Sequence, residues 1–166
     1  LKSRRSWRLL RTTQVDRAEE RTPALLGRVR KQVSFAHKSI PFIKSDQQSL
    51  FFPVKHYQLY LYPSFYVLLD NNAISVGSLS DVTISCEEVE YIEDEPLPKD
   101  AKIIRYTWKK ANLDGSPDKR FSGNVQIPIL RYIMITLLIQ NTHGRYLFSD
   151  AKAGEEFVAL FTKFCE

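Results

Sequence analysis

The chain has 166 residues, of which 43% are hydrophobic, 12% aromatic and 26% charged, and its formal net charge is +5. This length suits one domain with an appendage, and the apolar content is enough for a hydrophobic core, so global disorder is excluded. Two Cys residues are too few for a disulfide framework, and three scattered His residues lack zinc-ligand spacing. No apolar run has the length of a membrane-spanning helix. We expect a cytoplasmic protein without membrane contact, metal or cofactor.

The first 45 residues form a basic arm. Residues 1–44 carry twelve Lys or Arg against three acids, a net charge of +9, whereas the rest of the chain carries −4. The sequence predicts a short helix over residues 2–10 and a clearer one from Thr22-Pro23, a hydroxyl cap followed by proline. The apolar residues at helical spacing are Leu25, Leu26, Val29 and Val33. The basic residues singled out here are Arg4, Arg5, Arg8, Arg28, Arg30 and Lys31.

Two interpretations of this arm stay open. Its cations could bind nucleic acid, an anionic membrane or an acidic partner. Alternatively, its apolar stripe packs on the body and leaves a solvated basic face. Because the chain begins with Leu, we expect a fragment, a processed chain or a piece of something longer.

From Leu50 onward the apolar pattern has a period of two, which predicts about seven antiparallel strands. The predicted strands are residues 57–62, 65–69, 73–76, 82–86, 103–108, 127–139 and 145–148. A helix follows from about Ala151, capped by Ser149 or Asp150, with an apolar stripe of Phe157, Leu160, Phe161 and Phe164. Runs of strands closed by one helix favour an α+β fold or a barrel with a helical plug. We divide the chain into the arm, 1–45, and a domain, 50–166.

Residues 57–166 resemble bacterial pleckstrin-homology-like domains, close to the GRAM-type arrangement. The segments that carry the resemblance are YLYPSFYVLL, AISVGSL, GRYLF, AGEEFVALF and the loop TWKKANLDGSPDKRF…NVQIP. The strand pattern is generic, whereas the loop resembles a motif of bacterial proteins without assigned function. The resemblance implies a seven-stranded barrel closed by a helix, and a binding module instead of an enzyme. The basic pair that marks phosphoinositide binders is missing, because Asp70-Asn71-Asn72 stands in its place.

The most distinctive stretch is this loop, residues 107–128, TWKKANLDGSPDKRFSGNVQIP. Its Asn, Asp, Gly and Pro residues predict consecutive turns that hold cations on a rigid frame. The candidate anion-binding residues are Lys109, Lys110, Lys119 and Arg120. Arg120 either binds an anion or pairs with Asp114 or Asp118 and locks the loop. Trp108 and Phe121 are expected to pin the loop ends into the core.

The strand 127–139 is apolar on both faces, so both faces must be covered. The arm could cover the outer face, or another chain could, which would make this face an interface. The candidate interface residues are Leu130, Tyr132, Met134 and Leu138.

The acidic run 87–95, EEVEYIEDE, has three interpretations. It could protect a sheet edge, hold a divalent cation, or be the landing place of the chain's own basic arm. It lacks the oxygen spacing and central glycine of a calcium loop.

The function expected from these patterns is that of a non-catalytic protein-interaction module, an adaptor within a larger bacterial protein or complex. Its partner would be another chain or another domain of the same protein. The alternative is an anionic-ligand or nucleic-acid-binding module that uses the basic arm and the 109–120 loop. No nucleophile elbow or phosphate-binding glycine loop is present, and a hydrolase would need Asp114 and Asp118 to converge with a third acid.

Overall fold

The computed structural model describes residues 6–15, 24–40, 42–44, 46, 48–54, 56–70 and 73–165; for residues 7–9, 11–15, 24–29, 164 and 165 it describes the backbone alone. The elements, in chain order, are β1 (Ser6–Val15), β2 (Ala24–Gln32), β3 (Ala36–Lys38), β4 (Ser49–Val54), β5 (Tyr57–Leu61), β6 (Phe65–Leu69), β7 (Ile74–Ser78), η1 (Leu79–Asp81), β8 (Val82–Ile92), β9 (Lys102–Trp108), β10 (Gln126–Ile139), β11 (Thr142–Phe148) and α1 (Ala151–Cys165).

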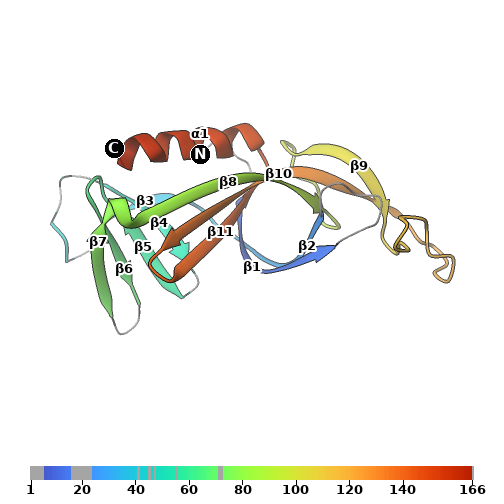
Figure 1. Ribbon diagram of the computed structural model, residues 1–166, viewed down its shortest axis with the longest axis horizontal. Helices are drawn as coiled ribbons and strands as arrows, with labels where there is room; N and C mark the ends of the chain where they lie inside the picture. Colours follow the sequence, from blue (N-terminus) through green and yellow to red (C-terminus); the bar gives the residue numbers. More distant parts are fainter. Residues whose placement is uncertain are drawn as a thin grey trace.

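The strands of the described residues form two sheets in an elongated molecule (Figure 1). The larger sheet has the order β11-β1-β2-β8-β10-β9, and the smaller has the order β3-β4-β5-β6-β7. Nearly all pairings are antiparallel; β2 and β8 pair in parallel. The predicted α+β class is therefore confirmed. The predicted single barrel of about seven strands is wrong, because the sheets are not closed into a barrel.

The long strand β10 organises the larger sheet. It pairs with β8 along one side, from Ile129 to Ile139, and with β9 and then β11 along the other. The odd-numbered residues from Ile133 to Ile139 enter the main core with aromatic residues of β4, β6, β11 and α1. On the other face, Leu130, Tyr132 and Met134 enter a second cluster with Val89, Tyr91 and Leu147. Both faces are thus buried over most of the strand, as the continuous apolar run predicts, although Leu138 near its end is exposed.

The N-terminal arm is not helical where the structure describes it. β1 pairs with β11 and β2, and β2 continues to β8, so these two strands belong to the larger sheet. The helix predicted from the spacing of the apolar residues is therefore wrong. Arg28 and Arg30 also fit the period of two of a strand, and Gly27 weakens a helix. Pairing of β1 with β2, and of both with the distant strands β11 and β8, supplies the hydrogen bonds that a helix would have made locally. Arg4 and Arg5 lie outside the described residues.

The helix α1 lies along one side of the sheets, over the half of the molecule that holds the smaller sheet (Figure 1). The Asp150 carboxylate accepts a hydrogen bond from the Ala153 amide at 3.3 Å, so of the two predicted caps, Ser149 and Asp150, the structure shows Asp150 in that role. Phe157 and Phe161 are buried against the main core, where Phe157 packs near the rings of Phe35, Phe52 and Phe148. Leu160, predicted on the same stripe, is exposed instead.

Candidate functional site

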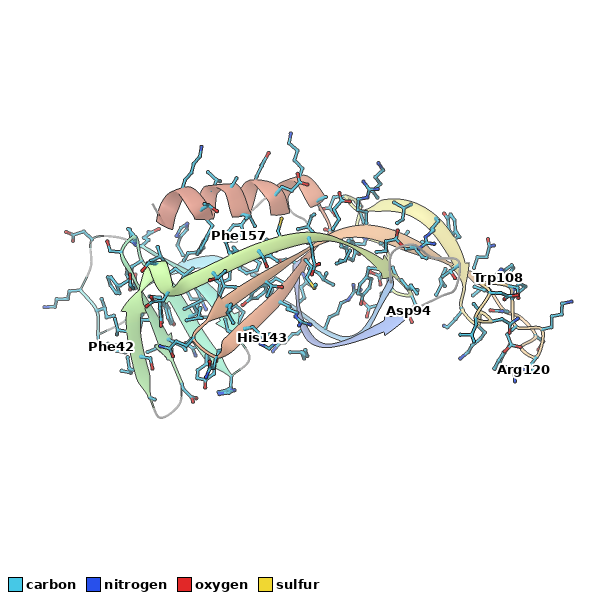
Figure 2. The ribbon with its side chains drawn as sticks, in the orientation of Figure 1. Phe42, Asp94, Trp108, Arg120, His143 and Phe157 are labelled. Atoms are coloured by element: carbon cyan, nitrogen blue, oxygen red, sulfur yellow. The ribbon has the colours of Figure 1, made fainter. Side chains whose placement is uncertain are left out.

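The loop between β9 and β10, residues 109–125, is named here the distal loop; its labelled residue Arg120 lies at the end of the molecule far from Phe42 (Figure 2). Backbone bonds close its base, since Lys109 donates to the Val125 carbonyl at 2.9 Å. The Asn124 side chain clamps the same level, accepting from the Lys110 amide at 3.0 Å and donating to the Lys110 carbonyl at 2.6 Å. The Asn124 side chain thus bonds to both the amide and the carbonyl of Lys110, as the backbone of a paired strand residue would.

The tip of the distal loop consists of consecutive turns. Asp114 accepts hydrogen bonds from the Ser116 amide at 3.0 Å and the Ser116 hydroxyl at 2.7 Å, an Asx turn. These bonds hold the pKa of Asp114 below its usual range. Asn112 donates its side-chain amide to the Ser116 hydroxyl at 2.9 Å. Gly115 and Gly123 adopt φ values of +82° and +73°, which residues with a side chain rarely adopt.

Arg120 belongs to the frame of the loop. Its guanidinium donates from Nε and Nη2 to the Asp118 carboxylate at 2.7–3.2 Å, and its amide donates to Asp118 at 3.0 Å. These bonds lower the pKa of Asp118 and raise the pKa of Arg120. Of the two interpretations left open by the sequence, the self-locking pair is therefore the one observed.

The outer surface of the distal loop mixes apolar and cationic side chains. Leu113 is 81% exposed, and Phe121 and Val125 are about half exposed. The predicted burial of Phe121 is wrong: its ring lies under Lys110, with Nζ 5.3 Å from the ring centre. Lys109, Lys110 and Lys119 are all exposed. The loop carries four cations and two acids, a net charge of +2.

Three of the four interface candidates on β10 are covered by the chain itself. Leu130 and Tyr132 have no exposed area, and Met134 is also buried; Leu138 alone is exposed, at 44%. Strand β2 contributes Arg30 beside this cluster, where the guanidinium lies 4.8 Å from the centre of the Tyr91 ring. The predicted interface at Leu130, Tyr132 and Met134 is therefore wrong, and these residues belong to the second cluster.

Arg30 is the arm residue whose role the structure defines. Its side chain and that of Glu93 are 4% and 1% exposed, and Arg30 Nη2 donates to both Glu93 oxygens at 2.8–2.9 Å and to Glu95 at 2.9 Å. The Tyr132 hydroxyl also donates to Glu93, at 2.9 Å. Burial raises the pKa of Tyr132, and Glu93 raises it further, so the phenol keeps its proton.

The ion pairs of Arg30 with Glu93 and Glu95 confirm, for this one residue of the arm, the hypothesis that the basic arm binds the acidic run 87–95 of the same chain. Lys31 is exposed, whereas the side chains of Arg8 and Arg28 lie outside the described residues. Glu90 and Tyr91 do not lie at a free sheet edge, since they pair with β2 on one side and with β10 on the other.

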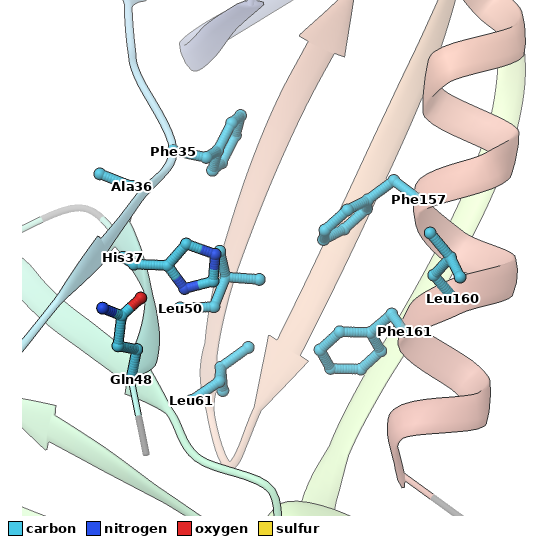
Figure 3. A pocket seen from close by; sticks show the side chains of 9 residues that line it. All are labelled: Phe35, Ala36, His37, Gln48, Leu50, Leu61, Phe157, Leu160 and Phe161. Carbon is cyan, nitrogen blue, oxygen red and sulfur yellow. The ribbon is translucent and has the colours of Figure 1, made fainter. Parts of the chain in front are cut away.

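An apolar cleft of about 380 Å³ lies between α1 and strands β3 to β5 (Figure 3). Phe157, Leu160 and Phe161 approach it from the helix, and His37 and Gln48 approach it from the opposite wall. Its volume lies in the range of small-molecule sites. The alternation of apolar and polar residues in the strands does not predict such a cleft, because the cleft depends on how α1 packs against the smaller sheet.

Within the described part of the chain, no group of three His, Cys, Asp or Glu side chains could hold a metal ion. Asp114 and Asp118, the acids that a hydrolase would need, serve separate turns of the distal loop. None of the helices among the described residues has the length and apolar content to span a bilayer. Compared with models of known protein families, with curated proteins and with solved structures, the chain has no match.

Proposed function

We propose that this chain is a non-catalytic protein-interaction module whose contact surface is the distal loop. The proposal rests on two features of the loop taken together: its charged groups are hydrogen-bonded within the loop, and an apolar side chain at its tip is exposed. Leu113 is 81% exposed at the tip, while both loop acids and Arg120 are held by bonds within the loop. A loop that is ordered before binding loses little conformational entropy when a partner covers it.

The partner that fits this surface is a protein with an apolar pocket surrounded by acidic residues. Leu113 and Phe121 supply the apolar contacts, and the exposed Lys109 and Lys119 supply positive charge at the rim. Among the described residues, no ion pair engages either lysine. Their charge therefore acts outward, where it speeds association and selects acidic partners.

The alternative function, binding of nucleic acid or an anionic ligand, has less support. Arg30 and Arg120 are the two arginines of that hypothesis whose side chains the structure describes, and each is engaged by carboxylates of the same chain. A phosphate would have to compete with those carboxylates. Binding through the remaining lysines alone would also leave the exposed Leu113 without a role.

The experiment is quantitative affinity capture from source cells with the wild-type chain and the variant Leu113→Asp/Lys119→Glu. We expect a stoichiometric protein partner that the variant recovers at least about tenfold less, because the variant removes an apolar anchor and reverses a rim charge. Capture should persist at about 1 M salt, where the Debye length is about 3 Å and phosphate contacts are screened.

The matched control is Leu138→Asp/Lys152→Glu, which makes the same change of charge at exposed residues of the body. It should recover the partner as the wild type does. Loss of the partner in the control with retention in the loop variant would place the contact on β10. Recovery of nucleic acid that disappears at high salt would favour the alternative function.

A further inference from the structure

Among the strands that the structure describes, β7 is at an edge of the smaller sheet, because it is last in the order and pairs with β6 alone. Its sequence, ISVGS, contains no charged residue and no proline. The edge strands β3 and β9 differ, since β3 carries Lys38 and β9 carries Lys102 and Arg105. Charges on an edge strand prevent it from pairing with other chains, and β7 lacks this protection.

The hydrogen-bond pattern defines which backbone amides and carbonyls of β7 face away from β6. Asp70 donates to the Ala73 carbonyl at 2.9 Å, and Leu79 donates to the Ser64 carbonyl at 3.3 Å. Because hydrogen-bonded pairs alternate along an antiparallel ladder, Ser75 and Gly77 direct their amides and carbonyls toward β6. Ile74, Val76 and Ser78 therefore direct theirs away from β6. The occupant that matches this edge is another extended strand.

The exposed side chains of β7 also favour the addition of a strand at this edge. Ile74 and Val76 are 60% and 62% exposed, and they lie opposite Leu69 and Val67 in the pairing with β6. Val67 and Leu69 belong to the apolar cluster on that face of the smaller sheet. The exposed residues thus extend this cluster to the edge of the sheet.

The sequence of β7 is complementary to itself in an antiparallel pair. With Val76 opposite Val76 of a second copy, Ile74 lies opposite Ser78, and every outward-facing residue meets another outward-facing residue. The three pairs provide about six backbone hydrogen bonds, two for each pair. Val76 also lies diagonal to Ile74 of the other copy, so the four apolar side chains form one cluster. No like charges meet across the two-fold axis.

We propose that two copies of this chain associate through β7, pairing antiparallel about Val76 and joining two five-stranded sheets into one. The interface is isologous, as expected of a two-fold dimer. It is also small, since β7 has five residues. We therefore expect a dissociation constant on the order of 10–100 µM.

The test is sedimentation equilibrium of the untagged chain over concentrations from about 1 to 500 µM, a range that brackets this expected constant. The wild type should pass from monomer to dimer. Val76→Lys should remain monomeric throughout, because it places two ammonium groups side by side at the two-fold axis. Val76→Pro should also remain monomeric, since it removes an amide that points away from β6 and leaves the inner ladder intact.

Leu113→Lys is the control, because it adds the same charge at another exposed apolar residue, in the distal loop. It should dimerise as the wild type does. Far-ultraviolet circular dichroism identifies a variant that has lost its fold, and the other position-76 variant then decides. A wild type that stays monomeric at about 500 µM, or folded Val76→Lys and Val76→Pro chains that still dimerise, would overturn the proposal.

Discussion

At the scale of single residues, this chain satisfies its charged groups in two different environments. In the distal loop, the exposed guanidinium of Arg120 donates two hydrogen bonds to the largely buried carboxylate of Asp118, which fixes the geometry of the turn. Beside the second cluster, the side chains of Arg30 and Glu93 are both buried, so each charge depends on the other. The same ion-pair chemistry thus orders a surface in one place and supports the fold in the other.

We expect Glu93→Ala to lower the free energy of unfolding by about 3–5 kcal/mol, because it leaves the buried Arg30 with only the exposed Glu95 as a carboxylate partner and Tyr132 without its acceptor. Urea denaturation followed by circular dichroism measures this loss. Arg30→Met/Glu93→Leu should lose much less, since it removes both charges together. Equal losses in the single and the double variant would contradict the assigned pairing.

The carboxylates of the distal loop predict a pH dependence of its structure. The pKa of Asp114 and the pKa of Asp118 are both lowered by hydrogen bonds, from Ser116 and from Arg120. A lowered pKa in the folded chain means that the stabilisation is complete above the ordinary Asp value of 3.8 and is lost as the pH falls through the lower value. In amide NMR spectra, the Ser116 and Arg120 signals should titrate with midpoints below 3.8. Midpoints at or above that value would show that the turns are open in solution.

At the scale of elements, the strands with local partners could be predicted from the sequence. The hairpins around β5, β6, β10 and β11 follow from alternating apolar residues and turn residues, and the cap of α1 follows from Asp150. β1 and β2 could not be predicted, because their apolar residues fit a helical spacing and because, besides pairing with each other, they pair with β11 and β8, which lie far away in the sequence. A helical spacing of Leu25, Leu26, Val29 and Val33 carries no information about such long-range pairing.

The candidate site divides in the same way. The frame of the distal loop follows from short-range turn chemistry, in which Asp and Asn bond to the backbone two residues away. The exposure of Phe121 and the burial of Leu130 and Tyr132 depend on where whole elements pack. Both faces of β10 had to be covered, but the sequence pattern could not distinguish cover by the arm from cover by another chain.

The contrast between Phe157 and Leu160 tests how α1 packs. Phe157→Ala should lower the free energy of unfolding by about 3–5 kcal/mol, because it removes a ring from a cluster of four other aromatic side chains. Leu160→Ala should change it by no more than about 0.5 kcal/mol, since Leu160 is 67% exposed. Thermal or urea unfolding compares the two variants directly. A larger effect at Leu160 would mean that the helix is rotated about its axis.

At the scale of the whole molecule, the two proposed contact surfaces lie at opposite ends. The smaller sheet with β7 stands at one end and the distal loop beyond β9 at the other (Figures 1 and 2). Neither proposed contact would block the other, and pairing through β7 would leave both distal loops of the dimer outward. Two loops in one assembly would raise the apparent affinity for a partner with repeated binding sites.

The most direct test of the central claim is amide hydrogen exchange of the wild-type chain, measured alone and then in complex with its captured partner. We expect additional protection in residues 109–125, with β10 beyond Ile129 and α1 unchanged. Protection confined to α1, the cleft of Figure 3 or the exposed end of β10, with the distal loop exchanging as it does in the free chain, would contradict it.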